Sequence, residues 1–335
     1  EARAFGVRSA MPTATALRLC PHLVVVRGRY GDYTKYSNKL YQRIVELAPL
    51  VERASIDEMY FDLTGCEVLY NNDLPGFIKR LQKIVWDDFH LPCTISLASN
   101  KVTAKIAAQT VKPAGVIYVP HGTESEFLAP LPVDAIPGVG KKTGEVLRRK
   151  GFHLVSDLQK TPREKLVRIL GKHGIWIHEV ANGFGPDELS TEHERKSIGN
   201  EETFAKDIGD KNELEKIVFS LTEEVCSSLR YRHLKGRTFT LKLRYSDFQT
   251  ITRATTIEPT DDDSIVFKTI KEMLATSYTR HLPLRLLGVR ASHLVEEEQL
   301  ELHLFPADQK RTNMLDAVDK IRKKFGDDVI HVGRQ

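Results

Sequence analysis

Two neighbouring acids, Asp57 and Glu58, open an apolar run in the segment ERASIDEMYFDLTG, residues 52–65. The run predicts a buried strand, and an unpaired carboxylate is costly to bury. Consecutive strand residues point to opposite faces, so both acids can face one ion only if the chain turns where the strand begins. Carboxylate oxygens suit Mg²⁺, which takes one or two of them and shares its other positions with phosphates and water. The alternative is a strand-entry pair that meets Arg53 or a lysine, and the pattern S-x-D-E alone favours it.

A second candidate group is a cation placed for phosphate. The segment SLASNKVTAKIAAQTVKPAG, residues 96–115, predicts a helix that begins after Asn100 and ends before Pro113. Lys112 would then be held rigidly beside a proline, and phosphate is a natural target for such a cation. An exposed lysine that complements the helix dipole is an equally good alternative.

The segment IPGVGKKTGEVLRR, residues 136–149, has the pattern of a helix-hairpin-helix. Gly138 and Gly140 would let backbone N–H groups approach a DNA phosphate at a helix N-terminus. Positive charge is added by Lys141, Lys142, Arg148 and Arg149. Such a motif binds the DNA backbone without reading sequence. A plain Gly-rich turn is less favoured, because spacing and charge agree.

Residues 197–296 predict a compact α+β unit in the order strand, helix, strand, strand, helix, strand. Apolar residues recur at helical spacing in 213–230, and Ser264 is a candidate N-cap for the second helix. In TFTLKLRY, residues 238–245, apolar residues alternate with polar ones that include Lys242 and Arg244. One face of this strand is therefore expected to pack while the other is polar and basic.

The segment EEEQLELHLFP, residues 296–306, is a hydrophobic hook after the last predicted strand. It could be an alternating edge strand, or a short peptide that docks into a groove of a partner protein. The hook consists of Gln299, Leu300, Leu302, Leu304 and Phe305. Residues 307–335 after it predict an amphipathic helix with a short strand after the helix.

The chain of 335 residues is long enough for two or three domains. Its net charge of +4 is modest, but residues 1–29 hold five Arg against one acid, and residues 230–253 hold seven basic residues against Asp247. Such blocks are typical of polyanion-binding faces, although a solvated surface explains either one equally well. The four cysteines form no C-x-x-C pattern, which argues against zinc and disulfides and fits a cytoplasmic protein. We see no signal peptide and no membrane-length apolar run.

Taken in order, several segments resemble the Y-family translesion DNA polymerases, specifically the bacterial DNA polymerase IV type. The matching segments are EARAFGVRSAMP, LRLCPHLVVV, SIDEMYFDLTG, SNKVTAKIAAQTVKPAG, IPGVGKKT and KSIGNEETF. The resemblance implies a right-hand polymerase of the α+β multidomain class. It has an antiparallel, ferredoxin-like palm, small fingers, a helical thumb with a helix-hairpin-helix, and an α+β little finger. The implied boundaries are fingers 1–28, palm 29–118, thumb 119–185, linker 186–196, little finger 197–296 and clamp-binding tail 297–335.

The resemblance also implies roles for the candidate residues. Asp57 would bind two catalytic Mg²⁺ ions and Glu58 the one that activates the primer 3′-hydroxyl. The remaining roles are triphosphate binding by Arg3 and Lys112, contact with the nascent base pair by Ser9 and Ala10, DNA binding by Gly138, Gly140, Lys141, Lys142, Lys242 and Arg244, and binding of the bacterial sliding clamp (its β subunit) by the hook. The implied partners are primer-template DNA, a dNTP and the clamp, with no membrane, and the protein is expected to be a monomer.

The chain begins at EARAFG with no initiator Met. In the family, a palm strand with a further metal-binding Asp, a bulky residue that excludes ribonucleotides and a triphosphate-contacting Tyr come before this point. We therefore expect this chain to be a poor or inactive polymerase, and the parent protein to be active. A non-catalytic adaptor that binds DNA and the clamp is the main alternative. A helix-hairpin-helix repair nuclease would explain residues 136–153 but neither the acidic pair nor the hook.

Overall fold

The computed structural model divides into two compact units, residues 1–192 (unit 1) and 193–335 (unit 2). The structure describes residues 1–191, 194–296, 306–325 and 329–330. The division falls inside the stretch 186–196, and the other expected domain boundaries stay predictions. None of the described helices combines the length and the low polarity that a membrane span requires.

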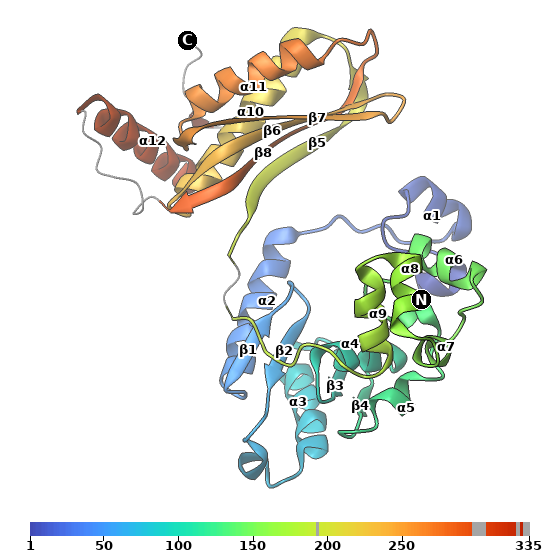
Figure 1. Cartoon of the computed structure of the whole chain (residues 1–335). Coiled ribbons are helices and arrows are strands. Elements are labelled where there is room, and N and C mark those ends of the chain that lie inside the picture. The colour runs from blue at the N-terminus through green and yellow to red at the C-terminus, as the bar shows by residue number, and fades with distance from the viewer. Residues whose placement is uncertain (192–193, 297–305, 326–328, 331–335) are drawn as a thin grey trace. The chain divides into compact units, whose positions relative to one another are not determined.

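Unit 1 contains sixteen described elements, coloured blue to green in Figure 1. They are η1 (Ala2–Phe5), α1 (Thr13–Leu19), α2 (Tyr30–Val45), β1 (Leu50–Arg53), β2 (Met59–Asp62), η2 (Glu67–Tyr70), α3 (Leu74–Phe89), β3 (Ile95–Leu97), α4 (Lys101–Thr110), β4 (Val116–Tyr118), α5 (Glu124–Leu128), η3 (Val133–Ala135), α6 (Lys141–Arg149), α7 (Val155–Gln159), α8 (Arg163–Leu170) and α9 (His173–Ala181).

The strands of unit 1 form two separate pairs among the described residues. Strand β1 runs antiparallel to β2, whereas β3 runs parallel to β4. The antiparallel pairing expected for the palm thus holds for the first pair and not for the second. Apolar residues of α2, β1 and α3, including Ile44, Val51 and Leu81, form the core under these strands.

Helix α4 begins where the sequence predicts it. Asn100 is its N-cap, since Asn100 Oδ1 accepts a hydrogen bond from the Thr103 N–H at 2.9 Å. Asn100 Nδ2 also donates to the Gly183 carbonyl at 3.0 Å. Downstream, the Ser190 N–H donates to the buried Glu52 carboxylate at 2.8 Å. The first part of the expected linker is therefore bonded to unit 1 rather than free.

Unit 2 has the predicted order of elements. They are β5 (Ser197–Ile208), α10 (Lys211–Arg230), β6 (Leu234–Tyr245), β7 (Thr250–Thr260), α11 (Asp263–Ser277) and β8 (Leu284–Glu296), followed by α12 (Pro306–Phe325). The strands form one antiparallel sheet in the order β5-β8-β6-β7. The expectation for Ser264 is wrong by two residues, because Asp262 caps α11 and accepts from the Ser264 N–H at 2.7 Å.

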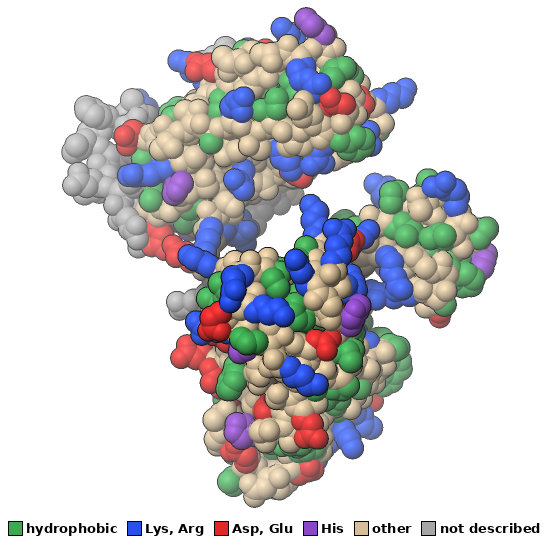
Figure 2. Space-filling view, turned by 45° about the vertical axis from the view of Figure 1, so that its right-hand side comes forward, with side chains coloured by type: hydrophobic (Ala, Val, Ile, Leu, Met, Phe, Trp, Pro, Cys, Tyr) green, Lys and Arg blue, Asp and Glu red, His purple; other side chains and the backbone are tan. Residues whose placement is uncertain are grey.

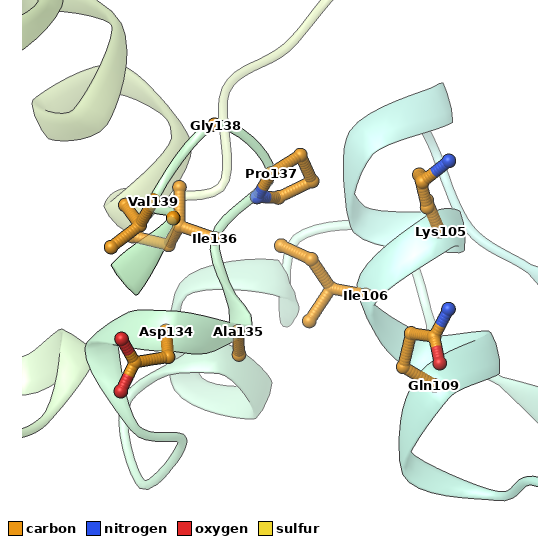
Figure 3. Close-up of a pocket in the computed structure, with 10 residues that line it drawn as sticks. Lys105, Ile106, Gln109, Asp134, Ala135, Ile136, Pro137, Gly138 and Val139 are labelled. Atoms are coloured by element: carbon orange, nitrogen blue, oxygen red, sulfur yellow. The ribbon is translucent and has the colours of Figure 1, made fainter. Parts of the chain in front are cut away.

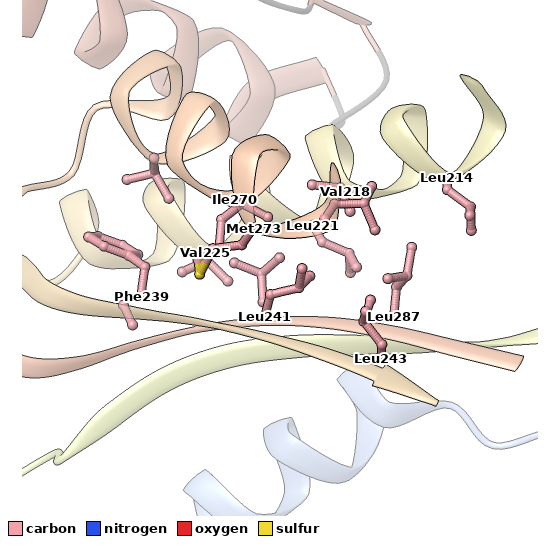
Figure 4. Packing of buried hydrophobic residues seen from close by; sticks show 14 of the residues in the cluster. Leu214, Val218, Leu221, Val225, Phe239, Leu241, Leu243, Ile270, Met273 and Leu287 are labelled. Carbon is pink, nitrogen blue, oxygen red and sulfur yellow. The ribbon is translucent and has the colours of Figure 1, made fainter. Parts of the chain in front are cut away.

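Helices α10 and α11 cover one face of this sheet (Figure 4). Val218 and Leu221 of α10 pack against Phe239 and Leu241 of β6, and all four are almost completely buried. Burying one side chain of this size stabilises the fold by about 1.5–3 kcal/mol. We call the opposite side of the sheet, which carries the alternate residues of each strand, the open face.

Helix α12 is the amphipathic helix expected after the hook. Leu315 and Val318 are buried, and two ion pairs join the helix to α10. Arg230 Nε lies 2.6 Å from Asp319 Oδ2, and Arg322 Nη2 lies 2.5 Å from Glu223 Oε1. The partly buried pair Arg230–Asp319 and the buried pair Arg322–Glu223 fix α12 to α10.

Candidate functional site

Asp57 and Glu58 lie on a sharp turn between β1 and β2. Ser55 holds this turn, because its Oγ accepts hydrogen bonds from the N–H groups of Asp57 and Glu58 at 3.2 and 3.0 Å. The same hydroxyl donates to Asp57 Oδ1 at 2.6 Å. The chain therefore turns at the two acids, and this turn allows both neighbouring carboxylates to face one site.

Lys105 of α4 forms an ion pair with Glu58. Its Nζ lies 2.6 Å from Glu58 Oε2, and this hydrogen bond raises the pKa of Lys105. The pairing with a lysine was one of the alternatives that the sequence left open, whereas Arg53 instead donates to Asn38 and Ser37. No ion pair among the described residues involves Asp57.

A cavity of about 1570 Å³ in unit 1 brings most of the predicted nucleotide-site residues together. Asp57 and Glu58 line it, together with Arg3 of η1 and Lys112 after α4. Strands β2 and β3 form part of its wall. Two acids and two cations from separate parts of the sequence thus share one space, which suits a triphosphate with its metal ions.

Ser9 and Ala10 do not line this cavity in the structure. They are exposed residues in a turn that follows η1, and Ala10 has a left-handed backbone (φ 62°). Their proposed contact with the nascent base pair stays a prediction.

The residues present fit a divalent cation in the chemistry of their donors. Two neighbouring carboxylates supply the hard oxygen ligands that Mg²⁺ takes from a protein when phosphates and water complete its shell. In the part of the chain that the structure describes, no group of three or more His, Cys, Asp or Glu side chains could hold a metal by itself. Substrate phosphates and water would supply further ligands to an ion held by Asp57 and Glu58.

The helix-hairpin-helix turn faces α4 across a smaller cavity of about 430 Å³ (Figure 3). Lys105, Ile106 and Gln109 line one side of it, and residues 134–140 line the other. The hairpin is closed by a hydrogen bond from the Val139 N–H to the Ile136 carbonyl at 3.0 Å. Trp176 of α9 stabilises the hairpin, because its Nε1 donates a hydrogen bond to the Pro137 carbonyl at 3.2 Å.

Lys141 and Lys142 are exposed at the start of α6, and Gly140 is the N-cap residue. An N-terminus with free N–H groups and two cations is a ready site for a phosphate. Arg148, by contrast, is paired with Asp134 and is less available than the sequence suggested.

Gly138 is the residue on which this hairpin most depends. Its φ of +92° lies in the left-handed region, and an added Cβ would lie 3.0 Å from His173 Nε2. We expect Gly138→Ala to destabilise unit 1 by about 1–2 kcal/mol, since both strain and crowding oppose the side chain. DNA affinity should fall with it.

Urea unfolding and DNA binding by fluorescence anisotropy measure these two effects. Gly122→Ala is the matched control for strain alone, because Gly122 also has a positive φ (+84°) and no atom lies within 4 Å of its added Cβ. Equal DNA affinity in the wild-type chain and Gly138→Ala would contradict the role of the hairpin.

The open face of the unit 2 sheet carries the predicted basic strand. Arg244 Nε donates to Thr250 Oγ1 at 3.0 Å, and Lys242 Nζ lies 2.6 Å from Glu201 Oε2. Arg290 of β8 joins this face, because it pairs with Thr240 in the register of the sheet. The sequence analysis did not identify Arg290. Its place two residues after Gly288, and therefore on the same face of the strand, could have indicated it.

The open face is otherwise rich in small hydroxyl and glycine residues. Three adjacent rows of the register on this face are Ser197–Ser292–Thr238–Thr256, Gly199–Arg290–Thr240–Ala254 and Glu201–Gly288–Lys242–Thr252. Hydroxyls, amides and cations are the groups that contact DNA phosphates. Figure 2 shows Lys and Arg side chains spread over both units, so basic charge is not confined to one of them.

The five residues of the hook, Gln299, Leu300, Leu302, Leu304 and Phe305, lie outside the described residues. Clamp binding by this segment therefore stays a prediction.

Comparison with known proteins gives consistent matches along the chain. The impB/mucB/samB family matches residues 1–109, its C-terminal domain matches 195–304, and the helix-hairpin-helix motif of the same family matches 121–152. The DNA polymerase IV of Opitutus terrae is 35% identical over 100% of this chain and 86% of its own length. DNA polymerase IV 1 of Bacillus subtilis is 33% identical over 99% of this chain and 81% of its own length.

Solved structures of Y-family enzymes share the fold. A Y-family DNA polymerase chimera of Dbh and Dpo4 has a TM-score of 0.76 at 22% identity, covering 88% of this chain and 86% of the chimera. An insertion ternary complex of Dbh DNA polymerase has a TM-score of 0.61 at 21% identity, with the same coverage of both chains.

The fold is therefore that of a Y-family DNA polymerase. Within this fold, the turn with Asp57 and Glu58 lines the same cavity as the cations Arg3 and Lys112. With curated relatives above 30% identity along its whole length, the chain belongs to the impB/mucB/samB family, among the relatives of DNA polymerase IV.

Proposed function

We propose that the protein is a DNA-directed DNA polymerase that copies past lesions with low fidelity and low processivity. The observation that carries this proposal is the single cavity lined by Asp57, Glu58, Arg3 and Lys112. The chain would transfer a nucleotidyl group from a dNTP to the 3′-hydroxyl of a primer.

Two divalent ions, when bound, would stabilise the attacking and leaving oxygens of this in-line displacement. Asp57 would hold both ions and Glu58 the one beside the primer hydroxyl. Arg3 and Lys112 would bind the triphosphate and orient it toward the carboxylates. Catalysis then depends mainly on positioning and on charge, which this cavity supplies.

Lys105 gives the site a second property. Because it pairs with Glu58, Lys105 and a divalent cation compete for the same carboxylate. Binding of the cation and the triphosphate together would release Lys105 from Glu58. Because Lys105 lines the same cavity, it could then bind phosphate oxygens of the triphosphate.

DNA would be held by sequence-independent contacts. The N-terminus of α6 with Lys141 and Lys142 supports backbone binding by unit 1, and the open face with Lys242, Arg244 and Arg290 supports it in unit 2. We further propose that the protein is a cytoplasmic monomer in its free form.

Primer extension by residues 1–335 on undamaged and lesion-containing templates tests this function. We expect slow incorporation that requires DNA, dNTP and Mg²⁺, because the phosphates of the dNTP and water must complete the shell of an ion held by two carboxylates. A rapid burst of product would contradict the low activity. No product at saturating Mg²⁺ or Mn²⁺, together with intact DNA binding, would contradict the polymerase function for this chain.

That last result would favour the second candidate, a non-catalytic adaptor that binds DNA and the clamp. The Lys105–Glu58 ion pair supports this candidate, because it neutralises one of the two acids without a metal. The exposed Asp57 carboxylate argues the other way.

We propose recruitment by the bacterial sliding clamp through the hook. Replacing Leu304 and Phe305 together with Ala should weaken clamp binding at least about tenfold, because the hook would lose its two largest apolar side chains at the end of the motif. Surface plasmon resonance with immobilised clamp measures this loss. Clamp-independent DNA binding is the internal control, and an unchanged clamp affinity would refute the role of the hook.

A further inference from the structure

We infer that Glu201 limits the DNA affinity of unit 2 by competing with DNA phosphates for Lys242. This inference rests on the proposed function, because it takes the open face of the unit 2 sheet as a DNA-binding surface. It assigns to Glu201, an acid that the proposed reaction does not use, the effect of weakening DNA binding.

Glu201 differs in charge from its neighbours in the register of the sheet. It is the one acidic residue in the three rows described above, among residues that are otherwise hydroxyl-bearing, small or basic. A carboxylate on a phosphate-binding face repels the phosphates of the ligand. Glu201 is 51% exposed and Lys242 is 30% exposed, so solvent and ligand reach both side chains.

The geometry of the sheet aims Glu201 at Lys242. Glu201 lies on β5 and Lys242 on β6, and β8 runs between them with Gly288 in the same row. A Cβ added at Gly288 would lie 2.9 Å from the Glu201 Cβ. The absence of a side chain there lets the carboxylate reach across β8 to within 2.6 Å of Lys242 Nζ.

Arg290 in the adjacent row provides the contrast. Gly199 lies opposite it on β5, and a Cβ added there would lie 2.8 Å from the Arg290 Cβ. No ion pair among the described residues involves Arg290. One cation of the open face is thus available to phosphate, while its neighbour is held by an acid.

An exposed ion pair of this kind is weak, so DNA can displace Glu201 from Lys242. The carboxylate then stays near the phosphate and opposes binding. In the wild-type chain, Lys242 therefore contributes less to DNA affinity than its position would allow, which suits a polymerase that must release its template readily.

The test is Glu201→Gln in the whole chain, with affinity for primer-template DNA measured by fluorescence anisotropy between 50 and 200 mM salt. In the wild-type chain the charge of Glu201 offsets that of Lys242 at the phosphate, so the variant gains one full phosphate contact, which steepens the slope of log affinity against log salt by about 0.9. When the salt concentration falls from 200 to 50 mM, the DNA affinity of the variant should rise about 3.5-fold more than that of the wild-type chain.

Glu202→Gln is the matched control. Glu202 is the next residue on β5 and removes the same charge, but it pairs with Leu287 on the helix-covered side of the sheet. Its slope should equal that of the wild-type chain. Equal steepening in both variants would overturn the inference, because net charge alone would then explain the effect.

Two more variants separate the inference from the proposed function. Lys242→Met added to Glu201→Gln should remove the extra slope, and Arg290→Met should reduce the slope in every background. If neither basic residue affects the slope, the open face does not bind DNA. If Arg290→Met reduces the slope while Glu201→Gln leaves it unchanged or weakens binding, the open face binds DNA and our inference about Glu201 is wrong.

Discussion

Replacing Asp57 with Asn, or Glu58 with Gln, is expected to reduce single-turnover incorporation of a nucleotide at least about a hundredfold. Each change keeps the size of the side chain and removes the charge that would hold a divalent ion. A hundredfold loss corresponds to about 2.7 kcal/mol of transition-state stabilisation, in the range for one electrostatic group at an active site. Quenched-flow primer extension measures this rate.

Binding of a fluorescent dNTP as a function of Mg²⁺ concentration gives a second measurement that does not depend on turnover. Both variants should lose the Mg²⁺ dependence while DNA affinity changes little. Asp62→Asn is the matched control, because Asp62 lines the same cavity but is bound to the N–H and hydroxyl of Thr64. Retained Mg²⁺-dependent dNTP binding in both Asp57→Asn and Glu58→Gln would refute the metal assignment.

Replacing Arg230 with Met is expected to destabilise unit 2 by about 3–5 kcal/mol. Arg230 is 5% exposed in its side chain and holds two carboxylates, Asp263 at 2.8 Å and Asp319 at 2.6 Å. Burial alone would lower the pKa of Arg230, but its bonds to Asp319 and Asp263 raise it. Burial also raises the pKa of Asp263, and Arg230 opposes this effect. Removing the guanidinium leaves both acids without their cation, which is the costly case for a buried pair.

Urea unfolding with hydrogen exchange read at β6 measures this loss for unit 2 alone. Lys271→Met is the control, because Lys271 pairs with Glu215 at 2.9 Å on the surface and should change stability by at most about 1 kcal/mol. Since Asp319 belongs to α12, exchange in that helix should also rise in Arg230→Met. Equal stability of the two variants would contradict the role of this buried cluster.

Local features of the fold could be predicted from the sequence. The cap at Asn100 and the alternation of Phe239 and Leu241 both follow from neighbours within a few residues. These features depend on backbone chemistry and on periodicity, which a single sequence contains. The positions of the acidic pair and of the helix-hairpin-helix were predictable for the same reason.

The partners of the charged groups could not be predicted in this way. Lys105 lies 47 residues from Glu58, and Lys242 lies 41 residues from Glu201. Each pairing depends on how one element is placed against another, or on the register of three strands. The sequence predicted Lys242 on a polar, basic strand face, whereas the structure places the acid Glu201 beside it.

The most direct test of the account is a crystal structure of the chain with primer-template DNA, a non-hydrolysable dNTP and Mg²⁺. We predict carboxylate oxygens of Asp57 and Glu58 at about 2.0–2.1 Å from bound metal, with Lys105 moved away from Glu58. A pocket that holds the nucleotide without metal, with Glu58 still bonded to Lys105, would contradict it.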